Sequence, residues 1–185
     1  MKITEAKWIE DFKEGKINGE TVEVSYKTYE QAKSFYAKEG ASLPDNTLMY
    51  TVYTCHTRND HTQNLNWGLT VMEPVCVAQE CNVTRGHFHE DEQCDEIYVC
   101  QKGEGLLLLM DEKGQCRAEK MREGSIHHID GAFAHRLVNT SDSKLEVMCC
   151  WPINAGHDYK RVENMPFSVR VFKEDGKITI KELTI

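Results

Sequence analysis

Short apolar runs separated by polar turn residues dominate the chain after Pro44. They recur roughly every 8–12 residues, which is the spacing of an all-β sandwich or barrel. Alternating β and α units would place longer periodic segments between the strands. The predicted strands are Met49–Cys55, Trp67–Met72, Val75–Gln79, Glu96–Gln101, Leu106–Met110, Cys116–Met121, Ile126–Ile129, Arg136–Asn139, Leu145–Trp151 and Ser168–Phe172.

The first 47 residues are polar and mixed, and one segment within them has a helical pattern. Thr28, followed three residues later by Gln31, fits a capping box, and Gly40 fits a helix stop. Between them lies a narrow apolar stripe formed by Ala32, Phe35 and Tyr36. The pattern predicts a helix over residues 29–39.

These patterns predict one all-β domain with an N-terminal helical extension. We expect residues 1–47 to form the extension, with its one helix packed on the barrel. Residues 48–173 would form the β-barrel, and residues 174–185 a C-terminal strand. The turn-forming segments Asp111–Gly114 and Glu174–Gly176 suit hairpins within this arrangement.

Composition excludes several classes of function. Thirty acidic against 22 basic residues give a net charge of −8, which argues against nucleic acid as a partner because phosphate backbones select clusters of Lys and Arg. The longest apolar run, Leu106–Met110, is far shorter than the roughly 20 residues of a membrane-spanning helix. We therefore expect a protein that binds neither nucleic acid nor membrane.

The eight cysteines do not read as a disulfide framework. Cys149 and Cys150 are adjacent, no CxxC pair occurs, and the N-terminus lacks the apolar stretch of a secretory signal. We interpret the cysteines as reduced, mostly buried thiols of a cytoplasmic protein.

Histidines and one glutamate carry the strongest chemical signal. His87 and His89 are two residues apart, so on a strand both side chains project to one face. Glu96 opens the next apolar strand after an acidic loop, and His135 begins a strand after a Gly-bounded turn. Three imidazoles and a carboxylate predict a site for one divalent metal ion. Fe(II), Mn(II), Ni(II), Co(II) and Zn(II) all suit these donors, and the ligand set alone does not choose among them.

Two segments resemble the paired motifs of the cupin superfamily of jelly-roll barrels. They are the segment from Gly86 to Glu96 and the segment from Gly124 to Asn139. In the second, Asp130 replaces the usual proline and Ala132 the usual glycine. The chain resembles the cupin-type glucose-6-phosphate isomerases over about Tyr50 to Val171. The similarity is carried by the segments Thr84–His89, His135–Asn139 and Ala155–Tyr159.

The resemblance implies a cupin fold, interconversion of glucose 6-phosphate and fructose 6-phosphate, and a homodimer. It also implies the site residues. The metal ligands would be His87, His89, Glu96 and His135, and the phosphate-side residues Thr70, Thr84 and Gly86. Tyr50, Tyr98, His157 and Tyr159 would line the sugar pocket, in which Trp151 stands where a tyrosine is usual.

Aldose–ketose isomerisation moves a hydrogen between C1 and C2 and a proton between their oxygens. A cation would stabilise an enediolate as a Lewis acid, and Glu96 is the first candidate for the base. Since metal binding weakens a carboxylate as a base, Tyr98 and His157 are further proton carriers, and a hydride shift would need no base.

Three other functions stay open at this stage. The same metal ligands can hold Fe(II) or Cu(II) in a cupin dioxygenase, and a cupin can bind sugars without catalysis. Another sugar or sugar phosphate, such as lyxose or mannose 6-phosphate, could also be isomerised. Because the chain is acidic and a phosphosugar is a dianion, local donors must supply the affinity. They are the side chains of Thr84, Arg85, His157 and Lys160 and the N–H of Gly86.

Overall fold

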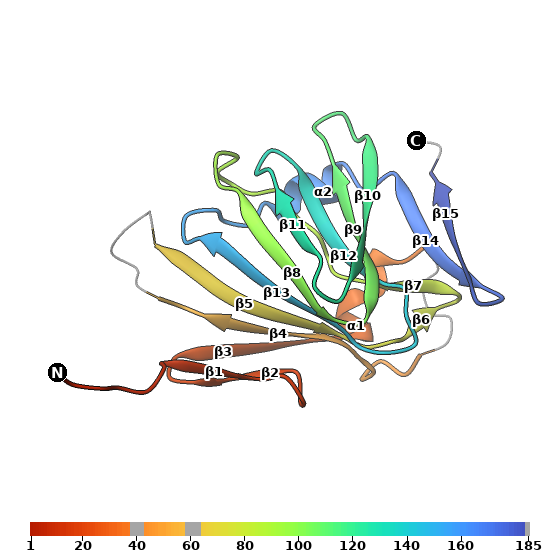
Figure 1. Cartoon of the computed structure of the whole chain (residues 1–185). Helices are drawn as coiled ribbons and strands as arrows, with labels where there is room; N and C mark the ends of the chain where they lie inside the picture. Colours follow the sequence, from red (N-terminus) through yellow and green to blue (C-terminus); the bar gives the residue numbers. More distant parts are fainter. Residues whose placement is uncertain (38–42, 58–63, 184–185) are drawn as a thin grey trace.

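Two antiparallel β-sheets face each other in the computed structural model, which describes residues 1–37, 43–57 and 64–183 (Figure 1). One sheet has the order β10-β9-β12-β7-β14-β15, with β6 paired to β7, and the other has the order β11-β8-β13-β5-β4-β3. The expected all-β, jelly-roll type of fold is confirmed. The bounds of the first sheet are β6 Cys76–Val77, β7 Glu80–Val83, β9 Glu104–Met110, β10 Cys116–Arg122, β12 Ala134–Asn139, β14 Val169–Glu174 and β15 Lys177–Glu182. Those of the second are β3 Val22–Thr28, β4 Leu48–Cys55, β5 Leu65–Met72, β8 Glu96–Lys102, β11 Ile126–Ile129 and β13 Leu145–Pro152.

The core lies between the two sheets. Strand β9, which lies between β10 and β12, is buried along nearly its whole length, and Leu107, Leu108, Leu109 and Met110 are at most 1% exposed. Side chains from the second sheet, among them Met72 and Leu145, belong to the same apolar cluster. This core fixes the two sheets relative to each other and so sets the shape of the cavity described below.

The expected N-terminal helical extension is not confirmed. Strands β1 (Trp8–Asp11) and β2 (Lys16–Gly19) form a separate hairpin, and β3 pairs along β4 as an edge strand of the second sheet. Helix α1 spans only Tyr29–Ala32 and continues as the 3₁₀ turn η1, Lys33–Phe35. The predicted helix start is correct, since the N–H of Thr28 donates to Oε1 of Gln31 at 3.1 Å. The predicted stop at Gly40 lies outside the described residues.

Most predicted strands are confirmed, with two differences elsewhere in the chain. Residues Val75–Gln79 do not form one strand, because the chain turns at Ala78 and Gln79 and begins β7 at Glu80. A second helix, α2, spans Tyr159–Asn164, with the Asp158 side chain accepting from the N–H of Arg161. No helix of the described residues is long and apolar enough to span a membrane.

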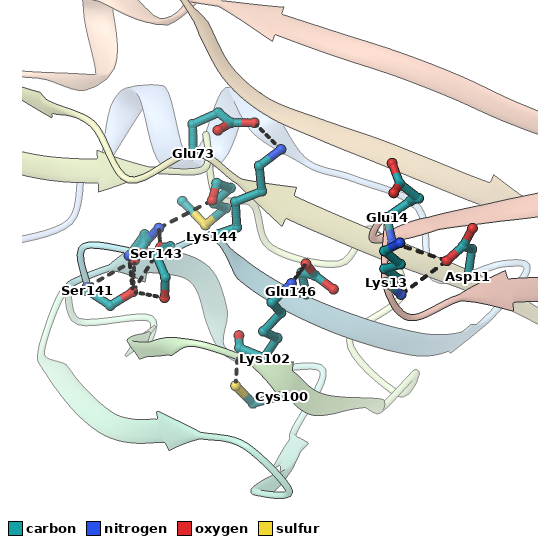
Figure 2. Close-up of polar contacts among 12 residues, drawn as sticks. Asp11, Lys13, Glu14, Glu73, Cys100, Lys102, Ser141, Ser143, Lys144 and Glu146 are labelled. Atoms are coloured by element: carbon teal, nitrogen blue, oxygen red, sulfur yellow. Dashed lines mark hydrogen bonds and ion pairs between the residues drawn. The ribbon is translucent and has the colours of Figure 1, made fainter.

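Polar contacts close the turn of the N-terminal hairpin, where Asp11 accepts from the N–H groups of Lys13 and Glu14, and pair charged side chains of the second sheet (Figure 2). Glu146 of β13 is buried, and its carboxylate accepts from Nζ of Lys102 on β8 at 3.2 Å. The turn between β1 and β2 lies against this carboxylate, since a Cβ at Gly15 would be 2.7 Å from its Oε1. The close approach and the φ of +62° both favour glycine at residue 15.

We expect Leu108→Ala to lower the free energy of unfolding by about 2–5 kcal/mol, because it removes buried methyl groups and leaves a cavity. Leu183→Ala is the matched control, since Leu183 is 37% exposed and its loss should change stability by less than about 0.5 kcal/mol. Urea denaturation measures both. Equal effects would contradict the placement of the core.

Candidate metal centre and substrate cavity

A β-bridge brings the two histidine segments together. His87 and His135 are bridge partners, with the N–H of His135 donating to the carbonyl of His87 at 3.0 Å and the reverse bond at 3.3 Å. Phe88, between the two neighbouring histidines, is fully buried beneath the guanidinium of Arg161, which lies 3.8 Å from its ring centroid. Residues 87 and 89 therefore share one face while residue 88 packs on the other, as their spacing predicts.

Four donor atoms converge on one point. The ligand atoms of His87, His89, Glu96 and His135 all lie within 4.8 Å of one another. Oε2 of Glu96 is 3.3 Å from Nε2 of His89 and 3.2 Å from Nε2 of His135. Glu96 begins β8 at the end of the acidic loop, and it is 5% exposed.

Two ring nitrogens in this group lack hydrogen-bond partners among the described residues. They are Nε2 of His87 and Nε2 of His135, both buried. Nε2 of His135 thus lies 3.2 Å from Oε2 of Glu96 without the geometry of a hydrogen bond. Buried polar atoms are nearly always satisfied, so nitrogens left over beside a buried carboxylate fit a cation-binding role.

Backbone carbonyls orient two of the imidazoles. Nδ1 of His89 lies 2.5 Å from the carbonyl oxygen of Cys94, and Nδ1 of His135 lies 3.3 Å from that of Phe133. When Nδ1 carries the proton and donates it to a carbonyl, Nε2 presents its lone pair to the centre. The residues therefore fit a divalent metal by donor type, burial and orientation.

The pKa values follow from burial and from the carboxylate. Burial, reinforced by the neighbouring histidines, holds the pKa of His87 well below its ordinary value, so this ring is neutral at pH 7. Burial also opposes charge on His89, but the hydrogen bonds to Glu96 and Cys94 outweigh it and raise the pKa. For Glu96, burial is outweighed by the contacts with His135 and His89, which lower the pKa and keep the carboxylate ionised.

A cavity of about 520 Å³ opens beside the four donors. Apart from Lys160, every residue that the sequence suggested for substrate binding or catalysis lines it, and three of the four metal-site residues do as well. The lining includes Tyr50, Thr70, Thr84, Gly86, His87, Glu96, Tyr98, His135, Trp151, His157 and Tyr159. His89 is the metal-site residue that lies behind this wall, and it is 2% exposed.

Aromatic rings form one side of the cavity. His157 stacks on Tyr159 with ring centroids 5.6 Å apart and planes within 10°, and its ring is 4.3 Å from that of His87. The guanidinium of Arg85 covers the ring of Tyr159 at 4.1 Å. Burial lowers the pKa of His157, so its imidazole is neutral. Burial next to Glu96 holds the pKa of Tyr98 well above its ordinary value, so this phenol keeps its proton.

The loop at Thr84–Gly86 is held from behind by Arg136. The guanidinium of Arg136 donates to the carbonyls of Thr84 at 3.0 Å and Arg85 at 2.7 Å and lies over the ring of Phe167. A Cβ at Gly86 would be 2.8 Å from Phe167, and the φ of Gly86 is +75°. Glycine is therefore required at this point of the cavity wall.

Sequence reasoning missed several residues of the site and misplaced one. Lys27 of β3, Asn66 of β5 and Cys149 of β13 also line the cavity. Burial holds the pKa of the Cys149 thiol well above its ordinary value, which disfavours thiolate ligation. Lys160 is not among the residues lining the cavity. Lys27 lies in a polar segment without a motif, so the sequence carries no signal that it lines the cavity. Its position there becomes clear only once β3 is placed beside β4.

The model of the family described as glucose-6-phosphate isomerase (GPI) matches residues 26–183. The chain belongs to the glucose-6-phosphate isomerase family. Among curated members, it is 33% identical to the glucose-6-phosphate isomerase of Thermococcus litoralis, over 73% of this chain and 70% of that protein. It is 32% identical to the enzyme of that name from Pyrococcus horikoshii, over 74% and 71% of the two chains.

Solved structures show a more distant likeness. Oxalate decarboxylase from Bacillus subtilis is 16% identical, with a TM-score of 0.47 over 59% of this chain and 26% of that one. A likeness at this level indicates nothing about activity. For this member of the glucose-6-phosphate isomerase family, an inference about activity therefore rests on the site geometry and on the family relatives.

Replacing His135 by Ala should remove most bound metal, because one of four convergent donors is lost. Elemental analysis after loading with Mn(II) and gel filtration measures the occupancy. His128→Ala is the matched control, since His128 is an exposed histidine of β11 paired with Asp95. Full occupancy in His135→Ala, with folding verified by circular dichroism, would contradict the ligand set.

Proposed function

We propose that this chain is a metal-dependent aldose–ketose isomerase that interconverts glucose 6-phosphate and fructose 6-phosphate. The observation that carries the proposal is the single cavity in which the four convergent donors stand beside neutral proton carriers and hydroxyl groups. Family membership supports the same substrate pair.

His87, His89, Glu96 and His135 would hold one divalent ion, with Fe(II) as our first choice. When bound, such an ion supplies Lewis acidity toward the carbonyl and hydroxyl oxygens of an open-chain sugar. The buried carboxylate of Glu96 balances part of the added positive charge. The neutral His87 requires no loss of charge to serve as a ligand, and the Nε2 atoms of His87 and His135 are free of other partners among the described residues.

Tyr98, His157 and Glu96 surround the space for the reacting carbons. Tyr98, whose phenol keeps its proton, is suited to donate a hydrogen bond to a sugar oxygen. His157 is neutral and Glu96 is ionised, so both can accept a proton, and the pKa of each lies below its ordinary value. Incorporation of solvent deuterium at C1 or C2 would support proton transfer through these groups over a hydride shift.

Hydroxyl groups and a backbone amide would receive the phosphate. We assign this role to Thr70, Thr84 and Gly86, with Tyr50 beside them, and the sugar chain to Trp151 and Tyr159. The cations Lys27 and Arg85 also line the cavity. They can pair with a dianion, although Glu23 and Glu96 also line the cavity and Arg85 is paired with Glu163.

Assembly and location are further parts of the proposal. We propose a homodimer, because the outward face of the second sheet carries the exposed apolar residues Leu65, Trp67, Ile97 and Ile126 on β5, β8 and β11. Light scattering after size exclusion tests the homodimer.

We also propose a cytoplasmic location, since all eight cysteines are free thiols in the structure.

Conversion of fructose 6-phosphate should be abolished by EDTA and restored by Fe(II) or another divalent ion. A coupled assay with glucose-6-phosphate dehydrogenase measures it, with each metal restored singly. No activity under any metal would contradict the isomerase assignment. Oxygen consumption in place of isomerisation would instead favour a dioxygenase.

Thr70→Val should raise the KM for fructose 6-phosphate about tenfold or more, because one hydrogen bond to a charged group is lost. The kcat should change much less, since the group acts on bound substrate and transition state alike. Thr51→Val on the neighbouring strand is the matched control. Thr51 is buried on β4 and is not among the cavity-lining residues. Equal KM values for the two variants would contradict the phosphate assignment.

A further inference from the structure

The β6–β7 hairpin places two cysteines directly opposite each other. Cys76 on β6 and Cys81 on β7 are paired residues of the antiparallel ladder. The two-residue turn between the strands consists of Ala78 and Gln79, whose φ angles are +48° and +73°. Two successive positive φ values are typical of a type I′ turn, which gives a tight hairpin with a fixed register.

The position of this pair in the ladder favours a bond between the side chains. The N–H of Asn82 donates to the carbonyl of Val75 at 3.1 Å. Because hydrogen-bonded and non-hydrogen-bonded pairs alternate along an antiparallel ladder, Cys76 and Cys81 form a non-hydrogen-bonded pair. In such pairs the Cα atoms are about 4.5 Å apart, at the short end of the range that disulfides span, roughly 4.4–6.8 Å.

The two thiols differ in exposure and in acidity. Cys81 is fully buried, whereas Cys76 is partly exposed. A hydrogen bond between the thiols lowers the pKa of Cys76 to about 7 and raises that of Cys81. Lys173, which is paired with Asp142 at 2.6 Å, also favours the Cys76 thiolate, and Asp142 opposes it. At neutral pH the accessible sulfur is therefore a nucleophile, with a second thiol beside it.

We propose that Cys76 and Cys81 form a reversible disulfide with each other when the protein reacts with a low-molecular-weight disulfide such as oxidised glutathione. The Cys76 thiolate attacks one sulfur of the oxidant, whose S–S bond breaks and releases one glutathione thiolate. The Cys81 thiol gives up its proton and attacks the Cys76 sulfur of the mixed disulfide, which releases the second glutathione. Two protein thiols are oxidised, one glutathione disulfide is reduced to two thiols, and the protein's protons end on the glutathione.

The bond would close the hairpin next to the cavity. Asn82 follows Cys81, and its side chain donates to the carbonyls of Met49 and Glu73 and accepts from the hydroxyl of Tyr36. The strand then ends at Val83, directly before Thr84 of the cavity wall. Disulfide formation would thus add a covalent link to the segment that leads into the site, whichever substrate the site takes.

Thiol mapping of the full-length protein tests the proposal. The native protein is incubated with graded mixtures of reduced and oxidised glutathione, quenched with acid, blocked with N-ethylmaleimide in denaturant so that buried thiols also react, digested and mapped by mass spectrometry. We expect a linked Cys76–Cys81 peptide, loss of both maleimide labels from this pair, label retained at the other six cysteines, and full recovery with dithiothreitol. Glutathione that remains on Cys76, or a linkage between other cysteines, would overturn the proposal.

Three variants keep the test independent of folding defects. Cys81→Ala should accumulate glutathione on Cys76, because the second thiol is missing, and circular dichroism verifies its fold. Cys76→Ser replaces the partly exposed member of the pair. In this variant Cys81 should remain a free thiol, with neither glutathione nor another cysteine bound to it. Cys150→Ser, on β13, should form the Cys76–Cys81 bond as the unaltered protein does. Oxidation of Cys81 in Cys76→Ser at the original rate would also contradict the proposal.

Discussion

A buried carboxylate among three imidazoles is the constraint on which the site depends. Glu96 is held at the start of β8 with its charge out of water, and taking an unpaired carboxylate out of water costs several kcal/mol. Contacts with His89 and His135 offset part of this cost, yet two nitrogens remain unsatisfied. A bound cation would satisfy the carboxylate and the nitrogens at once, which explains why a stable fold can tolerate this cluster.

The cavity around this centre reconciles an acidic protein with an anionic substrate. The net charge of −8 disfavours a sugar phosphate at long range. In the cavity two cations, Lys27 and Arg85, stand among two carboxylates, Glu23 and Glu96, and the Arg136 guanidinium holds the Thr84–Gly86 loop from behind, so individual donors rather than net charge must bind the phosphate. Neutral His157 and protonated Tyr98 line the same cavity, and Arg85 covers the ring of Tyr159 on which His157 stacks.

The sequence predicted the part of the site that depends on strand parity. The two-residue spacing of His87 and His89 fixes their shared face, and the apolar run after Glu96 marks the start of β8. The edge strand β3 was not predictable, because its partner β4 rather than its polar pattern stabilises it. Helix α2 was missed because it buries only Val162. The close approach of Cys76 and Cys81 depends on a turn with positive φ at Ala78 and Gln79, for which the sequence has neither Gly nor Asn.

X-ray absorption at the metal edge tests the central claim most directly. The protein would be loaded with one equivalent of Mn(II) or Ni(II) per chain, and the scattering around the ion recorded. The account predicts a shell of nitrogen and oxygen with the multiple scattering of three imidazoles. A sulfur scatterer, such as the Cys149 thiol in the cavity wall, or fewer than three imidazoles would contradict it.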